Sequence, residues 1–318
     1  MICVGSSEGF DILAPDDAYL SYLNSPYTGH SLGTAVDIYP RHEKWSGPVC
    51  SPITGTIARV KEIRMGRAKG FPTEDLDYAI GISPDGQSGH LLRVLHCRPK
   101  VSVGDEVVAG DRIGSCLRSR YFNYWTGPHY HVEVVPETMF SRSTKSVPLT
   151  LPLGASSKVR ESEEHEHTCQ VIVSRPGRVV CISETLPIAR FGPFFGHMIK
   201  TQSGTTGIID AGIPHYERGG IFSAQSVRPR ENIFLWNSRV GSRAIAGTSL
   251  RLFKTNRDLR VYLNGERALG LSLFLYPESL ITDSLVPIVI IPQRYGAFSN
   301  LVNKGDSVAL RIEDGSPY

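Results

Sequence analysis

Signals for several functions are missing from this chain of 318 residues. The formal net charge is only +3, and the Lys and Arg residues are scattered along the sequence. A nucleic-acid groove would require basic residues that are clustered and interleaved with aromatic ones. We therefore expect no nucleic-acid partner. The glycine-rich segments of the second half also lack the spacing of the common phosphate-binding loops.

An export signal and a membrane span are also missing. The first residues, MICVGSSEGFDILAP, contain neither a basic start nor a long apolar core. The most apolar late stretch, residues 269–291, is interrupted by prolines and acidic residues that a lipid-embedded helix would not tolerate. The sequence therefore predicts a cytoplasmic protein without a membrane span.

Closely spaced cysteine pairs are missing as well. No two of the six cysteines form a Cys-x-x-Cys pair. In a chain of this length, such cysteines are expected to be buried free thiols, with one disulfide pair as the alternative. They are Cys3, Cys50, Cys97, Cys116, Cys169 and Cys181.

Sustained helical periodicity is hard to find, and short runs rich in β-branched residues recur between Gly, Pro, Asp and Asn. This pattern is typical of strands joined by turns. Residues 77–96 form two alternating runs around Pro84-Asp85-Gly86 and predict a hairpin. Residues 249–276 alternate similarly and predict a meander. We therefore expect an all-β chain.

Residues 154–168 contain almost no large apolar side chain and are dense in Ser, Glu and His. This composition predicts a solvated linker between two β-rich domains, at 1–153 and 169–318. His165 and His167 alternate with glutamates there, and we interpret them as part of a solvated charged segment rather than as metal ligands.

The residue types of a catalytic zinc site, two imidazoles and a carboxylate, occur in residues 28–40 and 126–136. Alternation along a strand would place His129, His131 and Glu133 on one face. His30 and Asp37 could be roughly 23 to 25 Å apart if the chain between them were extended. Two ligands of one zinc lie only about 3 Å apart, so this segment must turn back on itself. A solvent-facing His beside an unrelated Asp is the alternative.

The segment GPHYHVEV, residues 127–134, resembles the GPHLHFEV-like signature of the lysostaphin-type (LytM-like) zinc endopeptidases. The surrounding order is also similar: His30 and Asp37, then SPITGTIARV, a hairpin that ends in His96, and VSVGDEVVAGDRIG. The resemblance covers about residues 26–136. Where that family usually has His-x-x-x-Asp, TGHSLGTAVD resembles the D-alanyl-D-alanine peptidases instead, so the subfamily and the substrate stay open.

The resemblance implies a lysostaphin-type, duplicated-hybrid-motif-like β-sheet domain that holds one Zn²⁺ through His30, Asp37 and His131. It also implies that His129 and His96 contact the bound water or the oxyanion. A zinc-bound water has a pKa near 7 and can attack an amide. The expected function is therefore a zinc-dependent peptidase with a peptide substrate. Glu133 is a candidate for orienting the strand histidines.

Two alternatives accompany this hypothesis. A cell-wall hydrolase should be exported, and no export signal is visible, so the domain could instead be a catalytically silent metal- or partner-binding module. SPITGTIARV and VSVGDEVVAGDRIG also resemble halves of biotinyl or lipoyl carrier domains, although no Lys lies in a suitable hairpin. The role of 169–318 and the oligomeric state stay open.

The other histidines have weaker patterns. His90 shares a predicted strand face with His96 and is the main competitor for its role. His42, His197 and His215 have no metal-ligand spacing, so we expect surface or satisfied polar positions for them.

Overall fold

The computed structural model describes residues 1–41, 44–86, 89–152, 154–243 and 251–315. Within these ranges the chain is almost entirely β-structure and divides into two compact units. The first unit contains Met1–Tyr22 and Tyr27–Pro152, and the second contains Leu23–Pro26 and Leu153–Tyr318. The expected all-β, two-domain architecture is confirmed. No helix in the described ranges is long and apolar enough to cross a membrane.

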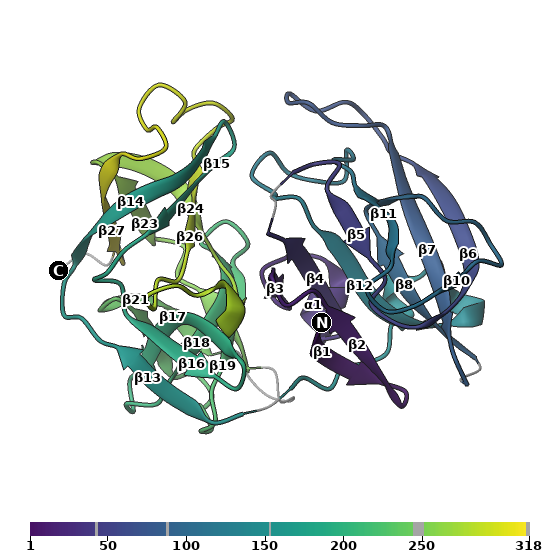
Figure 1. Cartoon of the computed structure of the whole chain (residues 1–318). Coiled ribbons are helices and arrows are strands. Elements are labelled where there is room, and N and C mark those ends of the chain that lie inside the picture. Colours follow the sequence, from purple (N-terminus) through teal and green to yellow (C-terminus); the bar gives the residue numbers. More distant parts are fainter. Residues whose placement is uncertain (42–43, 87–88, 153, 244–250, 316–318) are drawn as a thin grey trace. The chain divides into compact units, whose positions relative to one another are not determined.

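The first unit is built around one antiparallel sheet with the strand order β10-β6-β7-β8-β12-β4-β3 (Figure 1). A smaller sheet has the order β5-β11-β9, and β1 pairs with β2. The strands are β1 (Ile2–Ser7), β2 (Phe10–Ala14), β3 (Ala18–Ser21), β4 (Ala35–Pro40), β5 (Pro48–Cys50), β6 (Gly55–Arg64), β7 (Leu76–Pro84), β8 (His90–Leu95), β9 (Cys97–Pro99), β10 (Glu106–Val107), β11 (Arg112–Cys116) and β12 (Tyr130–Pro136). The short helices are α1 (Thr28–Leu32), η1 (Glu137–Met139) and η2 (Ser143–Lys145).

Apolar alternation explains the position of β12 in the interior of this sheet. Tyr130, Val132 and Val134 are fully buried, and each such side chain contributes roughly 1.5–3 kcal/mol by leaving water. Strand β12 lies between β8 and β4, with Val132 opposite both Val94 and Val36. This core holds the register that also places the polar residues of β12. The predicted hairpin in residues 77–96 is confirmed, because β7 pairs with β8.

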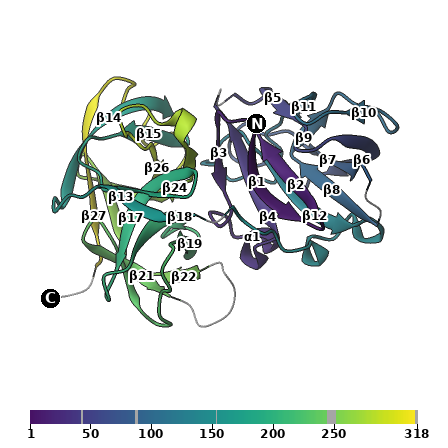
Figure 2. The ribbon, with the colours of Figure 1, turned by 60° about the horizontal axis from the view of Figure 1, so that its bottom comes forward.

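In the second unit, the antiparallel strands follow the order β13-β16-β17-β20-β21-β22-β19-β18-β24-β23-β27-β14-β15-β26 (Figure 2). Pairing of β17 with β18 closes one ring of strands, and pairing of β24 with β26 closes another. Closure leaves few unpaired edges. The elements are β13 (Ser156–Arg160), β14 (Glu166–Arg175), β15 (Arg178–Ile182), β16 (Ile188–Phe191), β17 (Phe194–Thr201), β18 (Thr206–Ile213), β19 (Arg218–Phe222), β20 (Asn232–Leu235), β21 (Ser238–Arg243), β22 (Arg251–Thr255), β23 (Arg260–Leu263), β24 (Glu266–Leu273), β25 (Tyr276–Pro277), η3 (Glu278–Leu280), β26 (Ile288–Pro292) and β27 (Ser307–Glu313).

The predicted meander in residues 249–276 is only partly correct. Strands β23 and β24 form the expected hairpin around Asn264-Gly265. Strand β22, however, pairs with β19 and β21 instead of β23. Local alternation identifies residues 251–255 as a strand, but it does not show which strands pair with it.

The structure also corrects the expected linker at 154–168. Residues Ser156–Arg160 form β13 and pair with β16, and Glu166 begins β14. His167 is fully buried, so its interpretation as a solvated residue is wrong. It lies on the buried side of β14 with Cys169 and Val171, because alternate residues of a strand share one face.

A second departure from the expected boundaries is that Leu23–Pro26 belongs to the second unit. The Leu23 amide donates to the buried Asp210 carboxylate over 2.8 Å, and the Asn24 side chain donates to the Leu273 carbonyl over 3.3 Å. The leucine side chain fills space beside Gly220 that a Cβ atom would occupy. All six cysteines are free thiols, as expected, and four of them are buried. The expected burial is wrong for Cys3, which is exposed, and for Cys50, which is only half-buried.

Candidate metal centre

A tight helical turn brings His30 and Asp37 together. Helix α1 ends at Leu32, and its C-cap residue Gly33 adopts φ 68° and donates its N–H to the His30 carbonyl. The Thr34 amide and hydroxyl both donate to the Gly29 carbonyl. The chain therefore reverses before β4 begins, and His30 Nε2 lies 3.2 Å from Asp37 Oδ1.

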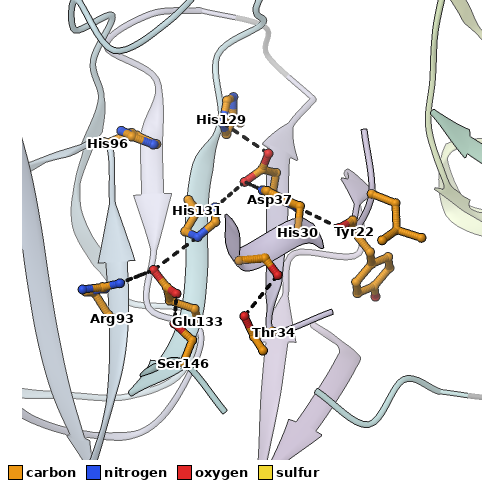
Figure 3. A network of polar contacts seen from close by, with 12 residues as sticks. Tyr22, His30, Thr34, Asp37, Arg93, His96, His129, His131, Glu133 and Ser146 are labelled. Atoms are coloured by element: carbon orange, nitrogen blue, oxygen red, sulfur yellow. Dashed lines mark hydrogen bonds and ion pairs between the residues drawn. The ribbon is translucent and has the colours of Figure 1, made fainter. Parts of the chain in front are cut away.

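The pairing of β12 with β4 supplies the third member of the group. His131 lies directly opposite Asp37, and its Nδ1 is 2.8 Å from the same Oδ1 atom. One potential ligand atom from each of His30, Asp37 and His131 lies within 4.8 Å of the others, and all three residues are buried (Figure 3). The structure therefore brings the three ligands expected from the sequence into one cluster. In the described ranges, no other group of three His, Cys, Asp or Glu residues meets this criterion.

The second nitrogen of each histidine in this cluster also has a partner. His30 Nδ1 lies 2.8 Å from the Tyr22 carbonyl, which can only accept, so Nδ1 carries the proton. His131 Nε2 lies 3.4 Å from Glu133 Oε1. Such partners fix ring orientation and leave the other nitrogen available for a metal ion.

Glu133 is itself held by a buried polar network. Its side chain is fully buried and accepts hydrogen bonds from Arg93 and Ser146. Arg93 also donates to the Phe140 carbonyl. Burial raises the pKa of Glu133, but the hydrogen bond and charge of His131, together with Arg93 and Ser146, lower it to about 2. The carboxylate is therefore ionised and faces His131, the position expected of an orienting residue.

His129 lies just before β12 and next to the same aspartate. Its Nδ1 is 2.9 Å from the Gly127 carbonyl, and its Nε2 is 3.6 Å from Asp37 Oδ2. Burial lowers the pKa of His129 to about 4, against the attraction of Asp37. The imidazole is consequently neutral at neutral pH, with its Nε2 directed toward the cluster.

His96 approaches from the end of β8 and has a backbone conformation rare outside glycine, with φ 65°. Its ring centroid lies 5.8 Å from that of His129 and 6.3 Å from that of His131. The competitor His90 lies elsewhere in the first unit, with its Nδ1 3.8 Å from Glu8 Oε2. Of the two histidines that the sequence offered for this role, His96 is therefore the one that lies near the cluster.

Sequence reasoning missed Asp77, which holds His96. Asp77 Oδ2 accepts from His96 Nδ1 and from the Ser119 hydroxyl, each over 2.7 Å. Burial raises the pKa of Asp77, but the charge of His96 and these hydrogen bonds outweigh that effect and lower it. The hairpin pattern contained a signal, because pairing of β7 with β8 places the start of β7 beside the end of β8.

Aromatic rings that no sequence motif indicated lie around His96 and His129. The Phe122 ring centroid lies 4.5 Å from that of His96 and 5.0 Å from that of His129. The Tyr121 ring centroid lies 4.8 Å from that of His96, and the Tyr121 ring stacks on Tyr27. These rings reduce the water around the cluster, which strengthens electrostatic interactions there.

The electrostatics of the cluster fit a cation. Burial raises the pKa of Asp37, but His30, His129 and His131 outweigh this and hold it well below its usual range. Burial also opposes protonation of His131, yet hydrogen bonds to Asp37 and Glu133 raise its pKa to about 9. Two nitrogens thus converge on one ionised oxygen, and a cation at His131 Nδ1 would take the place of a proton. Two imidazoles and a carboxylate form a donor set that suits zinc.

The remaining histidines do not join this group. His197 is fully buried in the second unit, so it is not a surface residue, and its Nε2 lies 3.1 Å from the Pro287 carbonyl. His215 is partly buried, with its Nε2 3.5 Å from Ser272 Oγ. His165 is exposed as expected, and His42 lies outside the described residues.

These observations define a two-domain, all-β protein with a buried His-Asp-His cluster. Residues 11–151 match the model described as the N-terminal domain of a domain of unknown function (DUF8155), and residues 188–294 match the C-terminal domain of the same family. Together the two matches cover most of the chain, and they fit its division into two domains. Neither the curated proteins nor the solved structures contain a match to it.

Proposed function

We propose that the first unit binds one Zn²⁺ through His30, Asp37 and His131 and hydrolyses an amide bond in a peptide substrate. The observation that supports this most is the convergence of three buried ligand atoms within 4.8 Å, each histidine having its other nitrogen satisfied. Zinc in such a site lowers the pKa of a water to about 7 and polarises a carbonyl.

The neighbouring residues suit the proton transfers of such a reaction. His129 is neutral, with its Nδ1 on the Gly127 carbonyl, so its Nε2 can accept a proton and later return it. His96 presents its Nε2 while Asp77 holds its Nδ1. Once protonated, either imidazole could stabilise a developing oxyanion. Phe122 and Tyr121 limit competing water.

A second candidate function is a zinc-binding module without catalysis. Its specific support is the burial of the cluster, because His30, Asp37 and His131 are only 1%, 4% and 7% exposed. Structural zinc sites are closed, whereas catalytic sites keep one position open to substrate. Both functions predict the same metal, and turnover separates them.

The test is metal analysis of the wild type and of His30→Ala and His131→Ala. His90→Ala is the matched control, because this histidine belongs to the same unit but pairs with Glu8 instead. We expect one zinc per chain in the wild type and control and loss of zinc from the two ligand variants. Equal zinc content in all four proteins would show that His30 and His131 are not zinc ligands.

A peptide-cleavage screen with the zinc-loaded protein then distinguishes the two candidates. Cleavage that is lost in His129→Ala while zinc is retained supports the peptidase. Bound zinc without turnover on a broad panel, including glycine-rich and D-alanine-containing peptides, supports the non-catalytic module.

A further inference from the structure

The second unit contains a cavity of about 230 Å³ beside β20, β21 and β22. Three of its lining residues are cationic and none is acidic. The lining residues are Asn232, Arg239, Gly241, Ser242, Lys254, Thr255, Asn256 and Arg257.

Strand pairing holds this lining in place. Asn232 lies opposite Ser242, which lies opposite Lys254 on the next strand. A Cβ atom at Gly241 would lie 2.2 Å from the Lys254 carbonyl oxygen, so glycine permits the close approach of β21 and β22. The turn after β22 is tied back by the Asn256 amide, which donates to the Val240 carbonyl over 2.8 Å. The cavity is therefore part of the sheet framework.

The charges around the cavity are not balanced by the protein. Arg257 pairs with Glu217 over 3.0 Å. Arg239 and Lys254 form no ion pair or side-chain hydrogen bond with any residue that the structure describes. Three cations and one neighbouring carboxylate leave a net charge of about +2.

Two buried polar atoms of the lining residues also lack a partner in the part of the chain that the structure describes. Arg239 Nε and Thr255 Oγ1 are both shielded from solvent and form no hydrogen bond with a described residue, and Thr255 is only 5% exposed. Buried donors nearly always have an acceptor, and an unpaired one is unfavourable. The Arg239 side chain is partly exposed and lines the cavity, so its guanidinium can meet a ligand rich in acceptor oxygens. Alternation along β22 instead turns the Thr255 side chain to the buried face that it shares with Phe253.

We propose that this cavity binds a phosphate group of a small ligand. A phosphate dianion matches the net charge of about +2, whereas a carboxylate carries one negative charge. Arginine offers a planar fork of donors to phosphate oxygens, and lysine adds a point charge. The site needs no glycine-rich loop, since strand side chains supply the donors. It is independent of the proposed zinc centre.

The test is a calorimetric titration of the full chain with inorganic phosphate, with acetate and chloride titrated at matched ionic strength. We expect saturable binding of phosphate, weakened about tenfold or more in Arg239→Ala, because hydrogen bonds to charged groups are strong. Lys254→Ala, which removes a second cation of the lining, should weaken phosphate binding by a smaller factor. Arg260→Ala removes an exposed arginine of β23 outside the cavity and should bind as the wild type does.

Three results would overturn the proposal. They are the absence of saturable phosphate binding, acetate binding as tight as that of phosphate, and equal weakening by Arg239→Ala and Arg260→Ala. The last would reflect general surface charge. If Arg239→Ala does not fold, Lys254→Ala provides the same comparison.

Discussion

Buried histidines occur in both units, but their surroundings differ. In the first unit, His30 and His131 meet Asp37, and His96 meets Asp77. In the second unit, His197 Nε2 meets a backbone carbonyl, and its Nδ1 has no hydrogen-bond partner among the residues that the structure describes. His167 contacts the Thr185 hydroxyl and packs near Trp236. Burial therefore does not identify a candidate site, whereas buried carboxylates beside the imidazoles do.

The pKa values express the same contrast. Burial opposes the charged form of an imidazole, because that form loses its hydration. For His131, the hydrogen bonds to Asp37 and Glu133 overcome burial and raise the pKa to about 9. For His197, burial dominates and lowers the pKa to about 4. The first unit thus gathers carboxylates that could hold a cation, while the cavity of the second unit gathers cations.

The largest expected effect comes from breaking the Arg93–Glu133 pair. Glu133→Gln leaves a buried arginine without its ionic partner, and loss of one member of a buried pair costs about 3–5 kcal/mol. The matched control is Glu137→Gln, since Glu137 pairs with Arg59 at the surface over 3.6 Å. Exposed pairs contribute only about 0–1 kcal/mol. Denaturant unfolding measures the loss of unfolding free energy in both variants. Equal losses would contradict the expected difference between the buried and the surface pair.

Zinc removal should affect the first unit selectively. At zinc one hundredfold above its dissociation constant, binding stabilises the folded protein by about 2.7 kcal/mol. Chelation should therefore speed amide hydrogen exchange in β4 and β12, which carry Asp37 and His131. Strands β14 and β15 should exchange as before. A uniform increase over both units would argue against a metal site confined to the first.

Acid should destabilise the protein through His197. Its folded pKa is about 4, below the unfolded value of about 6.5. As pH falls below about 6.5, the unfolded state binds the proton first, so stability present above that pH is lost by roughly 1.4 kcal/mol per pH unit down to about pH 4. His197→Gln should reduce the slope of unfolding free energy against pH. An unchanged slope in His197→Gln would contradict this assignment.

The smallest expected effect is that of Asp77→Asn. This change removes the carboxylate that accepts from His96 Nδ1 but none of the three proposed zinc ligands. We expect unchanged zinc content, an altered His96 tautomer in nitrogen NMR spectra, and a roughly tenfold loss of peptide turnover. An unchanged tautomer would show that Asp77 does not position His96.

Much of the candidate site follows from local patterns. Alternation in residues 129–133 assigned His131 and Glu133 to one strand face, and the glycines of TGHSLGTAVD allowed the reversal between His30 and Asp37. Local patterns failed where a partner came from a distant segment. Arg93 and the Tyr22 carbonyl carry no local mark of their roles, because strand register and chain packing bring them to Glu133 and His30.

The sequence by itself determined the all-β class, the hairpin in residues 77–96 and the order of the three proposed ligands, because these depend on spacing and alternation along one segment. Only the tertiary structure decided that His167 is buried, that β22 pairs with β19 and β21, and that Leu23–Pro26 belongs to the second unit. Those features depend on which strands pair across long separations. That choice is made by the whole core, and no short pattern contains it.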